Sequence, residues 1–171
     1  MNLKLINNYR DYEQQIYDFL TEYNNSKEEI IPVALRFEYY TFEQYCQYLE
    51  SRLIGIGDHV PATLYFTLDE DRNIVVGAVD MRHYLNDNLL AYGGHLGDSV
   101  LPSERRKGIA TAQIGLALKK YKEMGVDKVL ITCESWNIGS AKSIMNNGGI
   151  LENEVEVNSK IYQRYWVEQA S

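Results

Sequence analysis

Apolar residues in the N-terminal part of the chain recur at helical spacing. Through residues 9–24 they fall three or four positions apart, which predicts an amphipathic helix. A second helix is expected to begin at Thr41, because Gln44 stands three residues later as its capping-box partner. Its apolar stripe consists of Phe42, Tyr45, Cys46, Leu49 and Leu53. A short strand at residues 3–6 is expected before the helices, and a loop through Pro32 between them.

After residue 60 the pattern changes to short apolar runs that are typical of strands. The expected strands cover residues 62–68, 73–82, 93–101, 127–134, 149–157 and 160–167. The run at 93–101 is rich in glycine, which predicts a bulge or the close approach of another segment. Helical spacing returns from Gly108 to about Gly125, and again over residues 137–147. This order of helices and strands predicts the α/β (α+β) class with a mixed sheet, in a single domain spanning residues 1–171.

The charge and composition narrow the range of partners. The formal net charge of −7 argues against nucleic acid, because binding a phosphate backbone needs a broad basic face. No run approaches the roughly 18 apolar residues of a membrane span, and the first residues do not resemble a secretory signal. Cys46 and Cys133 lack metal-ligand spacing and the histidines are scattered, so we expect no metal site. A cytoplasmic location is the expectation.

Positive charge gathers where one helix should begin. The stretch SERRKGIAT, residues 103–111, places two arginines and a lysine directly before Gly108. The unpaired N–H groups of a first helical turn bind anions, and a glycine lets a ligand approach the backbone. The nucleotide-binding patterns G-x-x-x-x-G-K-[ST] and G-x-G-x-x-G are both absent. The stretch therefore indicates either an anion site of another type or a solvated basic loop before a helix.

Two segments resemble the GNAT superfamily of N-acetyltransferases. VLPSERRKGIAT, residues 100–111, is similar to the superfamily's acetyl-CoA-binding motif, [R/Q]-x-x-G-x-[G/A]. ITCESWNIGSAKSIMNNGG, residues 131–149, resembles its later strand, asparagine, short helix and glycine. The resemblance extends over residues 61–167. A narrower likeness, carried by an RHxLN…GGH stretch at residues 82–95, is to a branch of uncharacterised bacterial proteins in the superfamily.

The resemblance implies both a fold and an acetyl donor. The fold is a mixed, mostly antiparallel sheet of about seven strands, splayed in the middle and flanked by about four helices. Acetyl-CoA would be the donor, with its pyrophosphate on the N–H groups of the helix mouth and its pantetheine arm against the splayed strands. The residues implied in its binding are Ser99, Val100, Arg105, Arg106, Lys107, Gly108, Ile109, Ala110, Thr111, Asn137 and Ser140. Asn137 fits a helix N-cap equally well, and the two roles are compatible.

N-acetyl transfer needs a route for the proton of the amine. His95, Asp98 and Glu134 are the candidate bases, since all three belong at or near the strands expected to flank the thioester. His95 would instead hold a strand bulge by hydrogen bonding. Asp98 stands where members of the superfamily usually carry an apolar or aromatic residue. It is therefore either a carboxylate that serves the substrate or a variable position.

The usual general-acid tyrosine of the superfamily is missing. In the superfamily that tyrosine stands seven residues after the asparagine of the later segment. Here the asparagine is Asn137, and the tyrosine's position is occupied by Ile144. Tyr162 or Tyr165 is a candidate substitute. The backbone of a bulged strand at residues 98–100 would supply the donor for the tetrahedral oxyanion. The missing tyrosine keeps a second function open, a CoA-binding sensor or structural module without transferase activity.

The acceptor would be a primary amine of a small molecule or peptide, which the sequence does not identify. Arg82, His83 and Asn86 form a polar cluster that either shapes the acceptor site or anchors a loop. The two N-terminal helices are expected to form one wall of the acceptor pocket. Their tyrosines would stack on the acceptor or simply pack; they are Tyr9, Tyr12, Tyr39 and Tyr40. The C-terminal hairpin with Trp166 would supply the interface if the chain forms a homodimer.

Overall fold

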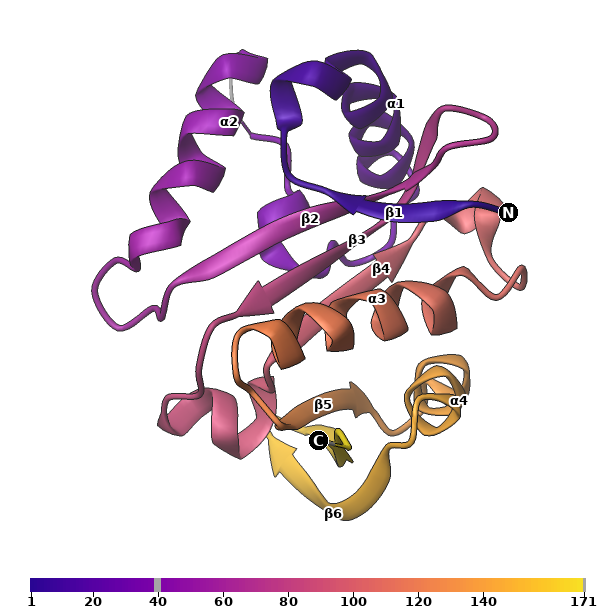
Figure 1. Cartoon of the computed structure of the whole chain (residues 1–171). Helices are drawn as coiled ribbons and strands as arrows, with labels where there is room; N and C mark the ends of the chain where they lie inside the picture. The colour runs from indigo at the N-terminus through magenta and orange to yellow at the C-terminus, as the bar shows by residue number, and fades with distance from the viewer. Residues whose placement is uncertain (39–40, 171) are drawn as a thin grey trace.

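A seven-stranded mixed sheet forms the centre of the molecule (Figure 1). The computed structural model describes residues 1–38 and 41–170, so the expectation for Tyr39 and Tyr40 lies outside the described residues. The strands are β1 (Leu3–Ile6), β2 (Ala62–Asp69), β3 (Ile74–Arg82), β4 (Leu96–Val100), β5 (Lys128–Glu134), β6 (Ile150–Val157) and β7 (Lys160–Glu168). They lie in the order β1-β2-β3-β4-β5-β7-β6, with β4 and β5 parallel and the other neighbours antiparallel. The expected mostly antiparallel sheet is confirmed.

Helices cover both faces of this sheet. They are α1 (Glu13–Asn24), α2 (Phe42–Ser51), α3 (Ile109–Glu123) and α4 (Ile138–Asn146). Helices α1 and α2 pack around one core, which includes Phe19 and Ala78, and we call this side the α1–α2 face. Helices α3 and α4 pack around a second core, which includes Ile114 and Val79, on the α3 face. Because side chains alternate along a strand, the adjacent residues Ala78 and Val79 of β3 serve opposite cores.

The N-terminal helix begins more tightly than its apolar spacing predicts. Tyr9–Tyr12 form a 3₁₀ turn, and α1 proper begins at Glu13. Such tightening is common at helix ends. The buried face still follows the expected stripe, which comprises Tyr9, Ile16, Phe19, Leu20 and Tyr23. The hydroxyl of Tyr9 donates to the carbonyl of Leu64 in the core, so this tyrosine packs rather than facing an acceptor.

Helix α2 begins as its capping box predicts. The Thr41 hydroxyl accepts the Gln44 N–H, and the Gln44 side chain accepts the Thr41 N–H, both at 3.1 Å. The apolar stripe also predicts a buried Leu53, and that prediction is wrong. The chain changes to a 3₁₀ turn at Arg52–Ile54, whose tighter winding rotates Leu53 outward to 43% exposure. In the same turn Arg52 reaches toward the sheet instead.

The glycine-rich run forms a shorter and more regular strand than its composition predicts. A π-helical turn, η4 (Leu89–Gly93), precedes β4, and the register of β4 against β3 runs without a shift. The expected bulge at residues 98–100 is therefore not found. The alternative, close approach, is confirmed: Gly94 has φ +73°, and a Cβ on it would lie 2.9 Å from the carbonyl oxygen of Leu130.

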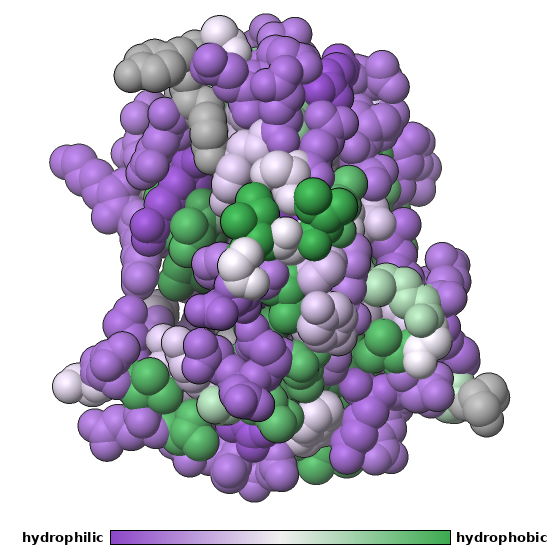
Figure 2. Space-filling view, turned by 90° about the vertical axis from the view of Figure 1, so that its left-hand side faces the viewer, coloured by the Kyte–Doolittle hydropathy of each residue, from purple (hydrophilic) through white to green (hydrophobic). Residues whose placement is uncertain are grey.

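The surface is mostly hydrophilic, with a group of apolar side chains visible on the side that carries α2 (Figure 2). The exposed apolar residues of the turn after α2 include Leu53 and Ile54. At the far edge of the sheet, the indole N–H of Trp166 donates to Glu152, and the Lys128 ammonium group lies 4.8 Å from its ring centroid. A dimer interface on this hairpin stays a prediction. Within residues 1–38 and 41–170, no helix is long and apolar enough to cross a membrane.

Candidate active site

The turn between β4 and α3 presents an open helix N-terminus. Gly108 is the N-cap of α3 and adopts φ +81°, the left-handed region that favours glycine. A Cβ on Gly108 would meet no atom within 4 Å, so the space in front of the helix is free. The first helical hydrogen bond runs from Ala112 N–H to Gly108. The earlier N–H groups of residues 109–111 are therefore oriented outward, as an anion requires.

The N-terminus of α3 differs from those of α2 and α4, which are capped by side chains, and resembles that of α1 in having no such cap. Thr41 caps α2, and the Asn137 side chain caps α4 by accepting the Ser140 N–H at 3.1 Å. Helix α3 has no side-chain cap. Its macrodipole and outward N–H groups are thus left for a ligand or for water.

The basic side chains of the turn are largely engaged elsewhere. Arg105 makes two 2.7 Å bonds to the carboxylate of Glu28, in the loop between α1 and α2. Lys107 donates to Glu104, whose pKa is held down to about 2 mainly by hydrogen bonds from an arginine, with Lys107 contributing. Arg106, at φ +64°, makes no ion pair within the described residues. The outward backbone N–H groups, rather than the paired side chains, are therefore the donors of this turn that remain available to an anion.

Strands β4 and β5 are joined at one end only. Their pairing is confined to Leu96 and Ile131, preceded by a bond from His95 N–H to the Leu130 carbonyl at 2.7 Å. Beyond that point β4 pairs with β3, and β5 with β7. We call the region past Leu96 and Ile131 the β4–β5 separation. It confirms the expected splay in the middle of the sheet.

The backbone of β4 offers donors to this separation. The Leu101 N–H donates to Val76 in β3 at 2.9 Å. Since N–H groups alternate in direction along a strand, those of Asp98 and Val100 are directed the other way, toward β5. Ser99 shares the direction of Leu101, and its carbonyl accepts a bond from α3. An extended ligand in the separation would therefore pair with Val100, whereas the Asp98 N–H also interacts with the carboxylate of its own side chain.

Asp98 lies on the α3 face of the separation. Its Oδ2 accepts the amide Nε2–H of Gln113 from α3 at 3.0 Å. Burial raises the pKa of Asp98 to about 6, against the opposing effect of the Gln113 bond. The charge of Asp98 also acts on Cys133, whose burial raises its thiol pKa to about 11. A protonated thiol at neutral pH makes Cys133 a poor nucleophile.

Gln113 is a site residue that the sequence analysis missed. Its side chain is fully buried, with Oε1 accepting the Thr67 hydroxyl at 2.7 Å and Nε2 donating to Asp98 and the Ser99 carbonyl. These partners fix the amide so that its donors face Asp98 and Ser99. Gly77 makes room for it, because a Cβ there would lie 2.4 Å from Oε1. The available signal is a glutamine within the apolar stripe of a helix.

Glu134 lies on the opposite, α1–α2 face. It ends β5 directly across from Tyr162 of β7. It is the largest cause of the raised pKa of Lys160, which also pairs with Glu29 at 3.4 Å. The ring of Tyr162 contacts that of Tyr92, with centroids 5.6 Å apart. Glu134 and Tyr162 thus share one surface, and Asp98 lies on the other side of the sheet.

His95 has a structural role. Its Nδ1 accepts the backbone N–H of Leu130 at 2.8 Å, which places the proton of the neutral ring on Nε2. Burial, together with the charge of Arg82, lowers its pKa to about 4. At neutral pH Nδ1 is occupied by the Leu130 N–H and Nε2 carries the ring proton, so neither nitrogen is available to take a proton from an amine. The structure favours the alternative role, in which His95 holds the strands by hydrogen bonding.

The remaining candidates near the separation are on or beside α4. Asn137 caps that helix through Oδ1, which leaves its NH₂ group available to a ligand. The Ser140 side chain hydrogen-bonds the thiol of Cys133. Ile144, at the usual tyrosine position, is fully buried. Tyr165 is buried on the same side of the sheet, and its hydroxyl donates to Gln163 at 2.8 Å.

The polar cluster after β3 divides into two parts. His83 Nε2 lies 2.8 Å from the Thr63 hydroxyl, and the Asn86 side chain accepts the Leu89 N–H at 2.9 Å and donates to the Asp58 carbonyl at 3.0 Å. These two residues anchor a loop. Arg82 is separate from them, because its side chain lies toward the β4–β5 separation.

Other parts of the described chain offer no competing centre for this chemistry. A surface cavity of about 300 Å³ between α1 and the turn after β4 contains none of the predicted cofactor or catalytic residues. Among the described residues no group of histidine, cysteine, aspartate and glutamate is arranged to hold a metal ion. Both cysteines are free and buried.

Comparison with known families and structures agrees with this geometry. Residues 14–143 match the model of the acetyltransferase (GNAT) family. The match covers more than half of the chain and begins well before residue 61, where the sequence resemblance starts, so it includes α1 and α2. A comparison with curated proteins gives no significant match.

Solved structures with the same fold are distant in sequence. The ribosomal-protein-S5-alanine acetyltransferase from Vibrio fischeri is 18% identical, with a TM-score of 0.71 over 98% of this chain and 92% of that chain. The microcin C7 self immunity acetyltransferase MccE, in complex with acetyl-CoA and AMP, is 18% identical, with a TM-score of 0.66 over 97% and 92%. An acetyltransferase (GNAT family) from Bacillus anthracis is 17% identical, with a TM-score of 0.63 over 98% and 95%.

Proposed function

Because the chain belongs to the GNAT family of acetyltransferases, we propose that it moves the acetyl group of acetyl-CoA to a primary amine by direct attack in a ternary complex. The observation that carries the proposal is an uncapped helix N-terminus next to two separating strands. Gly108 opens α3 shortly after β4, and β4 parts from β5 beyond Leu96. MccE, whose structure contains acetyl-CoA, has the same fold.

The residues present fit acetyl-CoA. The outward N–H groups at residues 109–111 and the open space before Gly108 suit a pyrophosphate. Arg106, which makes no ion pair with any residue of 1–38 and 41–170, adds a positive charge beside them. The N–H of Val100 would pair with an amide of the pantetheine arm, and Asn137 would approach from the other side of the separation through its free NH₂ group.

Two carboxylates on opposite faces of the sheet divide the proton transfers. When bound, acetyl-CoA supplies an activated thioester, whose C–S bond breaks as the C–N bond of the product forms. Glu134, on the α1–α2 face, accepts a proton from the ammonium group of the acceptor and returns it to solvent. The second proton, which the nitrogen loses as the amide forms, also passes to solvent. Asp98, on the α3 face, gives a proton to the leaving sulfur from the minor fraction of molecules in which it is protonated at neutral pH, and it regains one from solvent. Gln113 positions Asp98 for this role.

With Asp98 as the proton donor to the leaving sulfur, the role of the missing tyrosine is filled and Tyr162 is not needed for it. Tyr162 lies beside Glu134, on the acceptor side of the sheet, so it lines the acceptor site rather than serving the leaving group. The alternative function, a CoA-binding module without transferase activity, is motivated by the buried Ile144. A carboxyl group with a pKa of about 6 on the α3 face favours the transferase.

Two measurements test the proposal. Acetyl-CoA at 100 times its Kd should add about 2.7 kcal/mol to the free energy of unfolding. Release of the CoA thiol is then followed with amino acids, polyamines, aminoglycosides and peptides as acceptors. Release with any of these amines supports the transferase. Binding without release across the panel supports the sensor, and no stabilisation by acetyl-CoA contradicts both.

A further inference from the structure

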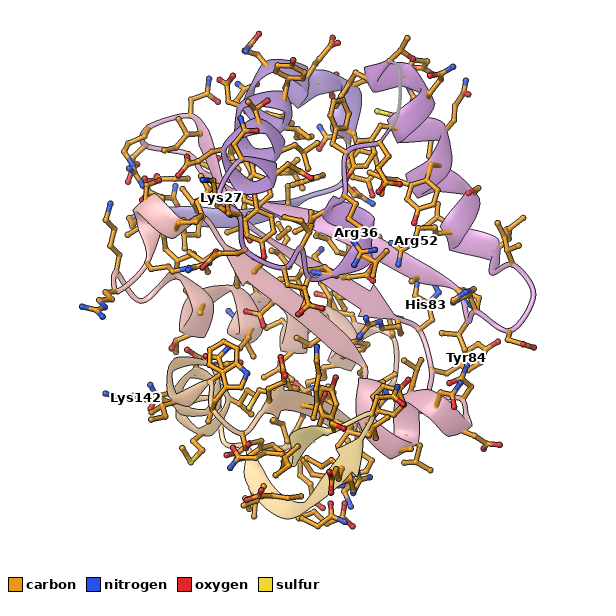
Figure 3. All side chains as sticks on the ribbon, turned by 180° about the vertical axis from the view of Figure 1, so that it is seen from behind. Lys27, Arg36, Arg52, His83, Tyr84 and Lys142 are labelled. Carbon is orange, nitrogen blue, oxygen red and sulfur yellow. The ribbon has the colours of Figure 1, made fainter. Side chains whose placement is uncertain are left out.

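The guanidinium group of Arg82 lies at the closed end of the β4–β5 separation, on the α1–α2 face. Arg82 is the last residue of β3. A Cβ on Gly97 of β4 would be 3.5 and 3.6 Å from its two terminal nitrogens, and 3.7 Å from the Pro32 side chain. The group therefore lies between β4 and the loop that joins α1 to α2, with 21% of the side chain exposed. Figure 3 views this face, with Arg52 and His83 labelled.

The positive charge of Arg82 is not neutralised by its neighbours. The nearest carboxylate, that of Asp80, receives two bonds from Arg52 at 2.8 and 2.7 Å, while Arg82 Nε is 3.7 Å from it. Two guanidinium groups thus share one carboxylate. His83 is neutral at neutral pH, because burial lowers its pKa, so it does not change this balance of charge. A net positive charge partly removed from water favours a bound anion.

Most of the N–H donors of Arg82 make no hydrogen bond within the described residues. A guanidinium group carries five N–H donors. Within the described residues this one makes a single hydrogen bond, from Nη1 to the Gly93 carbonyl at 3.3 Å. Arg52, by contrast, has both terminal nitrogens on Asp80. The unused edge of Arg82 matches the two oxygens of a carboxylate.

The spacing to Glu134 sets the size of the ligand. Leu96 pairs with Ile131, so Gly97 stands level with Thr132, and Glu134 lies two residues further along on the same face. At about 3.3 Å per residue, this places the backbone of Glu134 roughly 7 Å beyond that of Gly97, beside which the Arg82 guanidinium group lies. An ammonium and a carboxylate group on one carbon span that distance when each makes one hydrogen bond of about 2.9 Å.

We propose that the acceptor is an α-amino acid or a close analogue, with its carboxylate bound by Arg82 and its amine directed to Glu134. This inference rests on the proposed function and names its substrate class. It assigns Arg82 as the residue that selects for a carboxylate next to the reacting amine. Gly97 contributes by leaving room for the guanidinium group beside the strand.

The test compares acceptors that differ only in the carboxylate. CoA release is measured for the common L-amino acids, for the carboxamide of each active one, and for spermidine. Loss of the carboxylate should lower kcat/KM by at least about 100-fold, since a site built around a charged hydrogen bond discriminates strongly against its absence. Arg82→Gln should lower turnover of the amino acid and leave that of the carboxamide nearly unchanged. Arg82→Lys should recover part of the preference, mainly through KM.

Lys119→Gln is the control. It removes one positive charge from an exposed position on α3, on the other face of the sheet, and it should leave the preference unaltered. Melting temperatures of all three variants with and without acetyl-CoA show whether each folds and binds the donor. If Arg82→Gln does not fold, the ratio of amino acid to carboxamide in Arg82→Lys and in the wild type decides.

The failures are distinguishable. Equal turnover of amino acids and carboxamides, or turnover of spermidine but no amino acid, overturns the inference and upholds the acetyl transfer. An equal loss for both acceptors in Arg82→Gln also overturns it. Stabilisation by acetyl-CoA without release to any amine contradicts the proposed function, and the acceptor class falls with it.

Discussion

The Nδ1 atom of His95 accepts the backbone N–H of Leu130, 2.8 Å away, one residue before Leu96 and Ile131, the last pair that joins β4 and β5. Beyond this pair the two strands separate. The ring contacts Tyr121, whose hydroxyl donates to the His95 carbonyl at 2.7 Å. The histidine therefore closes the end of the separation and ties it to α3.

Replacing His95 should alter stability and its pH dependence. Its folded pKa of about 4 lies below the ordinary 6.5, so the unfolded state binds a proton that the folded state does not. The stabilisation is complete above pH 6.5 and is lost as pH falls toward 4, by up to about 3 kcal/mol. His95→Leu should lack this dependence, and should lose about 1–3 kcal/mol at pH 7, because the Leu130 N–H has no acceptor.

Urea unfolding at pH 7.5 and at about pH 4.5 measures both effects. His95→Asn is the control, since its amide oxygen can still accept the Leu130 N–H. It should lose less stability than His95→Leu. A His95→Asn variant that kept its stability but lost one limb of the pH profile of kcat/KM would instead make His95 the base.

Asp98→Asn should make the protein more stable and less active. The folded pKa of about 6 lies above the ordinary 3.8, so ionising Asp98 costs stability as pH rises from 3.8 through 6. At pH 7.5 the neutral amide should raise the free energy of unfolding by up to about 3 kcal/mol. The gain should vanish below about pH 4, where Asp98 is protonated in both states.

The same variant should lower kcat by about 10- to 100-fold, because it removes a proton donor to a leaving group that is already stable as a thiolate. Asp127→Asn, at an exposed position just before β5, makes the same change of charge away from the separation. It should change neither kcat nor the slope of stability with pH. Unchanged kcat in Asp98→Asn would remove Asp98 from the mechanism.

The sequence predicted the features that are local along the chain. The capping box of α2 lies within four residues, and the glycine turn before α3 is read from a single stretch around Gly108. The fold followed because strands and helices with one buried face repeat at distinct periods. The prediction that Leu53 is buried failed, because the spacing of apolar residues does not distinguish an α-helical turn from a 3₁₀ turn. The change to a 3₁₀ turn exposes Leu53 and brings Arg52 to the sheet.

The candidate site was less predictable, because its contacts join distant residues. Arg105 and Glu28 are 77 positions apart, and Asp98 and Gln113 are 15 apart on different elements. The sequence named Asp98 and Glu134 together, but only the pairing of the strands places them on opposite faces. His95 gave no local sign that its Nδ1 would be occupied by the backbone of β5.

Two substitutions at Gly108 should separate backbone geometry from charge. Asparagine and aspartate have the same size and tolerate a left-handed conformation, so each should cost only about 1–2 kcal/mol of stability at φ +81°. Gly108→Asp also puts a negative charge before the outward N–H groups and should abolish stabilisation by acetyl-CoA. Gly108→Asn should retain a weakened shift. Differential scanning fluorimetry with titrated acetyl-CoA compares them, and normal binding by Gly108→Asp would place the pyrophosphate elsewhere.

Removing one partner of the buried pair of Arg52 and Asp80 should lower stability strongly, whereas replacing both partners by apolar residues should lower it little. Asp80 is 3% exposed, so Asp80→Ala would leave two guanidinium groups without a carboxylate and lower stability by about 3–5 kcal/mol. The double variant Arg52→Met, Asp80→Leu removes both charges and should recover most of that loss. Chemical unfolding of Arg52→Met, of Asp80→Leu and of the double variant completes the cycle. Because Arg82 keeps its charge in the double variant, the preference for a carboxylate should persist there; its loss would mean that Asp80, and not Arg82 alone, organises the acceptor site.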